Sequence, residues 1–116
     1  MKYLIILNDA PYGTERSYNG LRLAISLSKQ PNPEVKVFLM ADAASCGKSG
    51  QVTPNGYYNL ERMLKSLVSK GIPVGACGSC MDARGLNPED MIQGVHKSTL
   101  EELTNWTLWA DKVIVF

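Results

Sequence analysis

The hydrophobic residues of this chain form short continuous runs, and segments with helical spacing lie between these runs. The runs that have the length and composition of strands are residues 2–7, 34–40, 72–76 and 111–116. Short apolar runs bounded by turn residues are typical of strands buried on both faces of a parallel sheet. The pattern therefore predicts a sheet with helices on both of its sides.

Two segments carry the spacing of amphipathic helices. Residues 14–29 set apolar side chains among polar ones, and Pro31 and Pro33 prevent that helix from continuing. Residues 60–68 repeat apolar side chains three and four positions apart. Lys70-Gly71 then closes this second helix with a cation in its last turn and a glycine after it.

Two capping patterns predict further helices. Asn87-Pro88-Glu89-Asp90 offers a capping asparagine, a proline at the first helical position and acids in the first turn. Ser98-Thr99-Leu100-Glu101 is a capping box that opens the last helix. Residues 41–56 lack periodicity and are interpreted as a long loop with a short turn of helix. The alternation of strands and helices predicts an α/β fold, a three-layer α/β/α sandwich with a mainly parallel sheet of about five strands.

Composition favours one domain spanning residues 1–116. The chain has 116 residues, of which 45% are hydrophobic and 20% charged, the balance of an ordinary globular domain. No apolar run approaches the roughly 20 residues of a membrane helix, and Met1–Leu7 is too short for a signal-peptide core. We therefore expect a cytoplasmic protein without a membrane partner. The net charge of +1, without a basic block, argues against nucleic acid as a partner.

The residues that could carry chemistry follow the predicted strands. Three polar segments stand at strand ends, residues 8–13, 42–50 and 77–85, and ligands bind beyond the carboxyl ends of strands in open parallel sheets. All three cysteines lie in the last two segments, and Tyr12 and Gly13 lie in the first. The cysteines are Cys46, Cys77 and Cys80. This convergence predicts a thiol site.

Cys77 is the candidate nucleophile. It follows a strand and precedes a glycine-containing turn, and backbone N–H groups near a thiolate lower its pKa. Gly78 and Ser79 would shape an anion-friendly turn, and Arg84 would add positive charge. Cys46 could face the same pocket from the neighbouring loop.

The residues leave other interpretations open. A cysteine at a strand end can be a small buried hydrophobe, whereas Cys-x-x-Cys, here Cys77 and Cys80, is typical of redox or metal sites. Zinc would need Cys46 and His96, which lack the paired spacing of a structural site, so we expect no metal. His96, the single histidine, is interpreted as a surface or capping residue.

The chain resembles the DsrE/DsrF-like proteins, which include the TusD-type subunits of bacterial sulfur relays. The resemblance is carried by the start Met1–Leu7 followed by Ala10–Thr14, by Cys77 with Arg84-Gly85 downstream, and by the closing Ala110–Phe116. It implies an α/β domain that assembles into homotrimers or homohexamers. It also implies that sulfur is carried as a persulfide on Cys77, which stands eight residues before Gly85. Cys80 is outside the TusD-like pattern but similar to some stand-alone homologues.

Three functions follow from these observations. The first is a persulfide carrier or sulfurtransferase in which Cys77 accepts sulfur, Cys80 assists, and protein donors and acceptors make a dissociable cofactor unnecessary. The second is a redox protein in which Cys77 and Cys80 cycle through a disulfide. The third is a non-enzymatic oligomeric binding module with incidental thiols. The residues expected to bind substrate are Tyr12, Gly13, Cys46, Gly78, Ser79 and Arg84.

Overall fold

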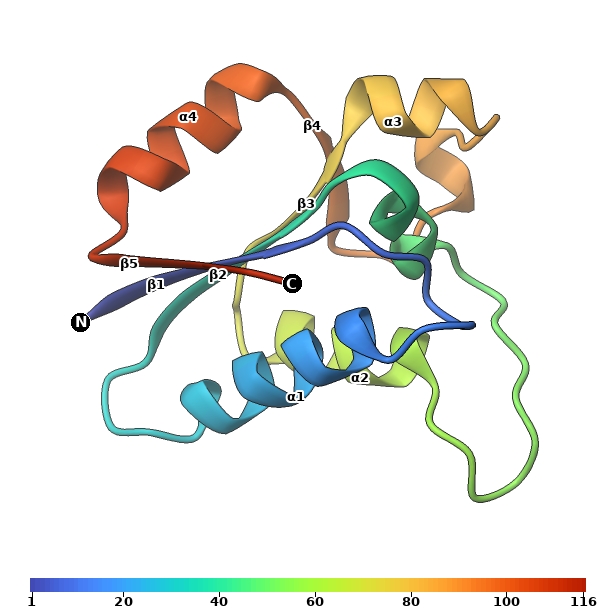
Figure 1. The fold of residues 1–116 in the computed structure, drawn as a ribbon, viewed down its shortest axis with the longest axis horizontal. Helices are drawn as coiled ribbons and strands as arrows, with labels where there is room; N and C mark the ends of the chain where they lie inside the picture. The colour runs from blue at the N-terminus through green and yellow to red at the C-terminus, as the bar shows by residue number, and fades with distance from the viewer.

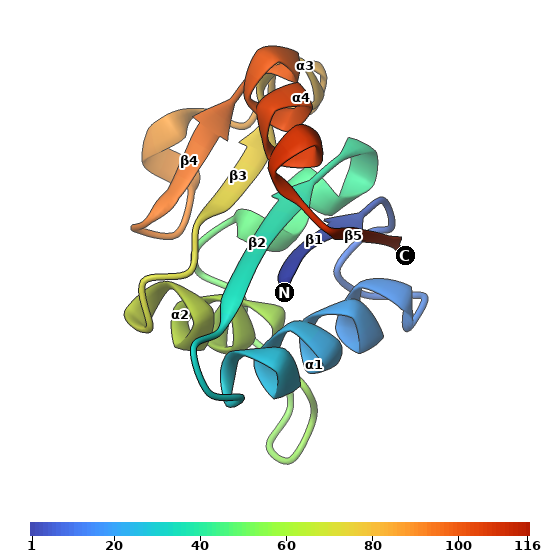
Figure 2. The same ribbon diagram turned by 90° about the vertical axis from the view of Figure 1, so that its left-hand side faces the viewer.

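A computed structural model describes residues 1–116 as a sheet of five strands with helices on both faces (Figure 1). The strands are β1 (Lys2–Leu7), β2 (Glu34–Leu39), β3 (Val74–Cys77), β4 (Val95–Ser98) and β5 (Lys112–Val115). They lie in the order β4-β3-β2-β1-β5, which can be followed across Figure 2, and every pair is parallel. The predicted α/β/α sandwich is therefore confirmed.

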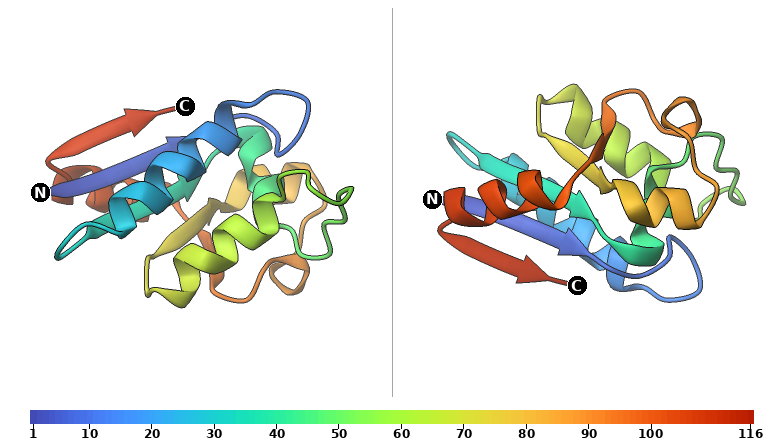
Figure 3. Two further views of the ribbon diagram at one scale, coloured as in Figure 1. Left: turned by 90° about the horizontal axis from the view of Figure 1, so that it is seen from below. Right: turned by 90° about the horizontal axis from the view of Figure 1, so that it is seen from above.

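Three longer helices complete the layers. Helices α1 (Arg16–Ser28) and α2 (Leu60–Ser69) cover one face of the sheet, and α4 (Leu100–Trp109) crosses the other (Figure 3). Three short elements lie at the carboxyl ends of the strands. They are η1 (Ala41–Gly47), α3 (Gly78–Ala83) and η2 (Pro88–Asp90).

Local sequence explains why the two covering helices on the first face form. The apolar stripe of α2 buries Leu60, Leu64 and Leu67 completely, and the Asn59 side chain caps the helix by accepting the Arg62 N–H at 3.0 Å. Helix α1 approaches the sheet at Gly20, where a side chain would collide with Leu7 of β1. The register of β1 with β2 runs over six residue pairs, which makes this the longest ladder of the sheet.

The hydrophobic core is divided unequally by the sheet. Twenty-one buried residues lie in the cluster that includes α1, α2 and η1, whereas four form the cluster on the α4 face. Those four are Leu4, Phe38, Leu103 and Trp106. Val113 and Val115 of β5 pair with Leu4 and Ile6 of β1 and stay exposed on this second face. One face of the sheet is therefore thickly covered and the other thinly.

The structure corrects three details of the predicted elements. Val95–Ser98 was not predicted as a strand, because only Val95 and Ser98 are buried and the two residues between them are exposed at the sheet edge. The helix predicted to start at Asn87 is a single turn, η2, after which the chain enters β4. The last helix is capped by Thr99, which accepts the Glu102 N–H at 3.1 Å, one residue later than expected.

Candidate functional site

Cys77 and Cys80 lie where β3 passes into α3. Cys77 is the last residue of β3 and caps α3, and the structure pairs it with Cys80 in a disulfide whose Cα atoms are 5.2 Å apart. The Cys80 N–H donates to the Cys77 sulfur at 3.3 Å, and the Ser79 hydroxyl lies 3.4 Å from the same sulfur. Hydrogen-bond donors of this kind favour the thiolate form of a cysteine.

Cys80 receives a donor from the neighbouring strand end. The Ala41 N–H donates to the Cys80 sulfur at 3.2 Å. Ala41 lies two residues after Leu39, the last residue of β2, and has φ of 54°, a left-handed conformation that costs a non-glycine residue about 1–2 kcal/mol. The strained turn thus aims a backbone donor at the second sulfur of the pair.

A cleft of about 460 Å³ opens beside the two cysteines, between α3 and α4. Its apolar wall consists of Phe38, Met40, Leu100 and Leu103. Its polar lining comes from α3 and from the end of β4. These residues are Cys77, Gly78, Ser79, Cys80, Asp82, Lys97, Ser98 and Thr99. The cleft lies at the carboxyl ends of β2, β3 and β4, the expected position for a ligand in an open parallel sheet.

Gly78 allows the close packing that forms this cleft. A Cβ atom at this position would lie 2.7 Å from the Ser98 carbonyl oxygen of β4, closer than real Cβ contacts allow. Any side chain would therefore push α3 away from β4. Gly78 therefore has a structural role at the site, and its role in substrate binding stays a prediction.

Both cations near the thiols are held by carboxylates. Arg84 donates to Asp42 Oδ1 at 2.7 and 3.1 Å and to the Cys80 carbonyl oxygen at 3.0 Å, so it ties α3 to η1. Lys97 of β4 reaches Asp82 of α3 at 2.8 Å across the rim of the cleft. Neither pair leaves a free positive charge facing the sulfurs.

Behind the cleft, Ser98, Glu102 and His96 form a hydrogen-bonded chain. The Ser98 hydroxyl donates to Glu102 Oε1 at 2.6 Å, and His96 Nε2 contacts the same oxygen. Gly75 makes room for this chain, since a Cβ atom there would lie 3.3 Å from His96 Nε2 and 3.2 Å from the Ser98 Cβ. Burial alone would raise the pKa of the Glu102 carboxyl, but hydrogen bonds from Ser98 and His96 outweigh it and hold that pKa below its usual value.

Cys46 does not join the site. It is fully buried in the larger core, and its sulfur lies 3.7 Å from the Asp9 carbonyl oxygen. Burial raises the pKa of the Cys46 thiol to about 12. This cysteine is a core residue, and it is absent from the lining of the cleft beside Cys77.

Tyr12 and Gly13 are also absent from the lining of the cleft beside Cys77. The Tyr12 hydroxyl donates to Gln51 at 2.6 Å and accepts the Leu60 N–H at 3.2 Å, so it fastens the segment before α2 to the turn after β1. Gly13 is exposed and has φ of 102°, which only glycine adopts without strain. Of the predicted binding residues, the structure brings Gly78 and Ser79 to the cleft and sets Arg84 behind it.

Several cleft residues were missed by the sequence analysis. Lys97 and Ser98 come from the unpredicted strand β4, and Leu100 and Leu103 come from the first turn of α4. The signal that could have found them is Ser98-Thr99, a polar pair that ends one element and caps the next.

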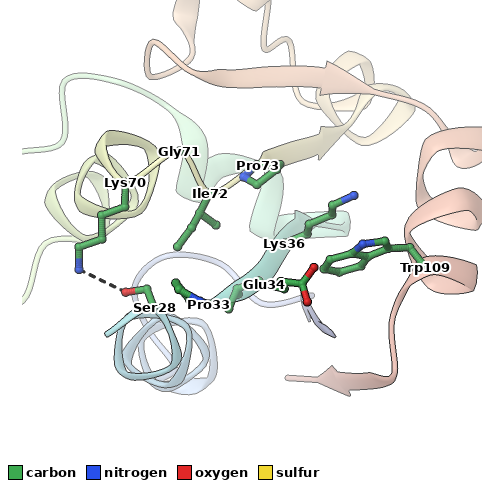
Figure 4. Close-up of a pocket in the computed structure, with 10 residues that line it drawn as sticks. Ser28, Pro33, Glu34, Lys36, Lys70, Gly71, Ile72, Pro73 and Trp109 are labelled. Carbon is green, nitrogen blue, oxygen red and sulfur yellow. Dashed lines mark hydrogen bonds between the residues drawn. The ribbon is translucent and has the colours of Figure 1, made fainter. Parts of the chain in front are cut away.

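A second pocket of about 310 Å³ lies at the opposite end of the sheet (Figure 4). It contains no cysteine or histidine, and its lysines already have partners. Lys70 donates to the Ser28 hydroxyl at 3.2 Å, and Lys36 lies 4.2 Å from the centre of the Trp109 ring. Its lining therefore offers no group for the chemistry that the thiols suggest.

The structure also lacks two kinds of feature. No three side chains from histidine, cysteine, aspartate or glutamate come together in a way that could hold a metal ion. No helix combines the length and the apolar character required to cross a membrane.

The structure defines a small α/β protein with a cysteine pair at the carboxyl end of β3. The family model of the DsrE/DsrF-like family matches residues 1–116, and the chain belongs to this family. The resemblance seen in the sequence is thereby confirmed.

Relatives and solved structures agree with this assignment. Protein YchN of Escherichia coli is 46% identical over 116 residues, which cover 99% of this chain and 98% of YchN. An uncharacterized protein of Methanopyrus kandleri is 41% identical over 112 residues, covering 97% of this chain and 91% of that protein. The crystal structure of the Escherichia coli ychN protein superposes with a TM-score of 0.93 over 99% of this chain and 98% of its own. A protein of unknown function from Methanobacterium thermoautotrophicum shares the fold at 12% identity, with a TM-score of 0.75 and full coverage of both chains.

Proposed function

We propose that the protein handles sulfane sulfur and carries it as a persulfide on Cys77. The observation that supports this proposal most directly is the half-buried Cys77 sulfur, which lies in an open cleft and faces two hydrogen-bond donors. Membership of the DsrE/DsrF-like family agrees with a role in sulfur relay. We further propose that the donor and acceptor are other proteins of a reducing cytoplasm.

Once a dithiol reductant has opened the Cys77–Cys80 disulfide seen in the structure, the loading step needs no oxidant. The Cys77 thiolate attacks the outer sulfur of a donor persulfide, R–S–SH. A bond forms between Cys77 Sγ and that sulfur, the donor S–S bond breaks, and R–S⁻ leaves with the electron pair. The product is Cys77–S–SH, and the same exchange in reverse passes the sulfur to an acceptor thiolate.

A second candidate function is supported by the pairing of Cys77 with Cys80 in the structure. In this scheme the Cys80 thiolate attacks Cys77 Sγ of the persulfide, the Cys77–Cys80 disulfide forms, and HS⁻ leaves. A dithiol reductant then restores both thiols. The protein would act as a sulfide-releasing redox device in which Cys80 is required.

Intact-protein mass distinguishes these functions. Reduced wild type, Cys77→Ser, Cys80→Ser and Cys46→Ser would each be incubated with a persulfide donor. If the protein is a carrier, its mass increases by about 32 Da, and a reductant reverses the increase. Among the three variants, only Cys77→Ser should fail to show this increase. The redox device instead loses about 2 Da and requires both Cys77 and Cys80.

Cys46→Ser is the matched control because that thiol is buried away from the cleft. An unchanged mass together with a Cys77 that resists alkylation would contradict both functions and leave a binding module.

A further inference from the structure

The lining of the cleft beside Cys77 indicates which kind of carrier group the donor persulfide has, provided that the proposed persulfide chemistry holds. We infer that the cleft selects donors whose carrier group is uncharged and apolar, and that it disfavours donors bearing carboxylates. The inference depends on the lining of the cleft and on the pairing of its charges.

One wall of the cleft is apolar, and part of it is exposed to solvent. Phe38 and Leu103 are buried at its floor, whereas Leu100 is 75% exposed at the start of α4 and lines the same cleft as both cysteines. An apolar group bound against Leu100 would remove that side chain from water, at roughly 25 cal/mol for each Å² covered. The wall therefore favours an apolar carrier group.

The charges of the cleft cancel. Among its twelve lining residues, Asp82 and Lys97 are the charged ones, and their side chains are 2.8 Å apart. Arg84, outside the lining, is held by Asp42 at 2.7 Å. The Glu102 carboxylate adds negative charge behind Ser98. A carboxylate on the donor would be repelled by Asp82. It could bind Lys97 only after the ion pair between Asp82 and Lys97 had been broken.

The volume suits a modest carrier group. At about 460 Å³ the cleft falls within the range of roughly 300–1,000 Å³ typical of small-molecule sites. The same chemistry could come from a small organic persulfide or from a cysteine persulfide flanked by apolar residues in a protein. The test below separates these two sources.

The measurement is the second-order rate of persulfide formation on Cys77 in a Cys80→Ser background, which blocks internal disulfide formation. Benzyl hydropersulfide is the neutral apolar donor and glutathione persulfide the carboxylate-bearing one. Each rate is divided by the rate of the same donor with a small free thiol, which removes differences in intrinsic reactivity. We expect a normalised preference of about ten-fold or more for the benzyl donor, equivalent to about 1.4 kcal/mol.

Two variants test the apolar wall and the Asp82–Lys97 pair separately. Leu100→Ser should lower the normalised benzyl rate several-fold and leave the glutathione rate unchanged. Asp82→Asn should free Lys97 and raise the glutathione rate several-fold. Leu108→Ser is the matched control, because Leu108 is a similarly exposed leucine of α4, at 80%, that lies outside the cleft.

The outcomes distinguish this inference from the proposed function. Equal normalised rates for both donors, or a loss with Leu108→Ser as large as with Leu100→Ser, would overturn the selectivity while leaving Cys77 as a persulfide carrier. Failure of every donor to load Cys77 would overturn the proposed function, and the selectivity with it.

Peptide persulfides then identify the source. A short peptide whose cysteine is flanked by leucines is compared with one flanked by aspartates and with the benzyl donor. A leucine peptide that outruns the benzyl donor assigns a protein source, and the opposite order assigns a small molecule; both orders support the apolar class. A preference for the aspartate peptide would overturn the inference that the cleft selects apolar donors.

Discussion

The two faces of the sheet place cysteines in opposite chemical environments. On the α1 and α2 side, Cys46 is fully buried among twenty-one core residues, and burial raises the pKa of its thiol to about 12. On the α4 side the core has four buried residues, and Cys77 packs at its margin, open to a cleft and facing hydrogen-bond donors. The comparison shows that the two thiols differ in how thickly they are covered, and the predictions below test whether this difference governs their reactivity.

The largest expected difference between the faces is in thiol reactivity. With the protein reduced, at about pH 8, iodoacetamide should alkylate Cys77 at least about a thousand-fold faster than Cys46. A pKa of about 12 leaves very little Cys46 thiolate until the pH approaches that value. Peptide mapping after timed quenching measures both rates. Unfolding in denaturant should equalise them, and comparable labelling in the folded protein would contradict the contrast.

Stability should show the same asymmetry between the faces. Leu64→Ala in the thick core should lower the free energy of unfolding by about 3–4 kcal/mol, and Leu103→Ala on the thin face by about 2 kcal/mol. Leu64 is fully buried, whereas Leu103 keeps 9% exposure and borders the cleft, so its cavity can fill with water. Urea denaturation measures both values. Equal losses would mean that the two faces are equally well packed.

A smaller change should couple stability to the thiol site. Gly78→Ala should lower the free energy of unfolding by about 1–3 kcal/mol and slow alkylation of Cys77, because α3 must move away from the Ser98 carbonyl. Ala83→Ser, on the exposed part of α3, is the control and should change neither quantity. If Gly78→Ala destabilised the protein without changing the alkylation rate, the packing of α3 would not control the reactivity of Cys77.

The Ser98–Glu102–His96 chain should give the thin face a pH signature. Because the pKa of folded Glu102 is lowered, its stabilising contribution is present above the ordinary carboxyl pKa of 4.5 and is lost as pH falls through the lowered value. The difference in unfolding free energy between wild type and Glu102→Gln should therefore be largest above pH 4.5 and shrink as the pH falls below that value. Urea titrations at several pH values measure this difference. A difference that does not change with pH would contradict stabilisation by the Ser98–Glu102–His96 hydrogen bonds.

The smallest expected effect concerns the strained residue at the site. Ala41→Gly should raise the free energy of unfolding by up to about 1 kcal/mol, since glycine adopts a φ of 54° without strain but loses more backbone entropy on folding. Thermal denaturation measures the shift. Asn32→Gly, which relieves a φ of 51° far from the thiols, is the matched comparison, and only Ala41→Gly should alter Cys80 alkylation.

Periodicity predicted the parts of the fold with strong hydrophobic patterns. The six-residue strands β1 and β2 and the stripe of α2 are read directly from their apolar residues. Strand β4 was missed because an edge strand with two exposed central residues has almost no pattern. Its absence from the prediction removed Lys97 and Ser98 from the expected site.

The position of Cys77 at a strand end could be predicted from sequence, but its surroundings could not. Cys77 stands at a strand end, which local sequence reveals. Whether Cys46 reaches it depends on packing between η1 and the helices of the opposite face, which involves residues far apart in the chain. The partners of Arg84 and Lys97 are likewise tertiary: Arg84, which the sequence offered as a free cation, is paired with Asp42, and Lys97, which the sequence did not suggest, is paired with Asp82.

Helix α4 also holds both tryptophans of the chain, Trp106 and Trp109. Trp106 stacks edge-on against Phe38, a floor residue of the cleft, with ring centres 6.1 Å apart. The indole of Trp106 therefore reports on the thin face, whereas Trp109 lines the pocket that it shares with Ser28 and Lys70. If α4 loosens before the rest of the sheet, the emission will change at lower urea than the far-ultraviolet circular dichroism. Trp106 is thus an intrinsic optical probe of the layer that borders the cleft beside Cys77.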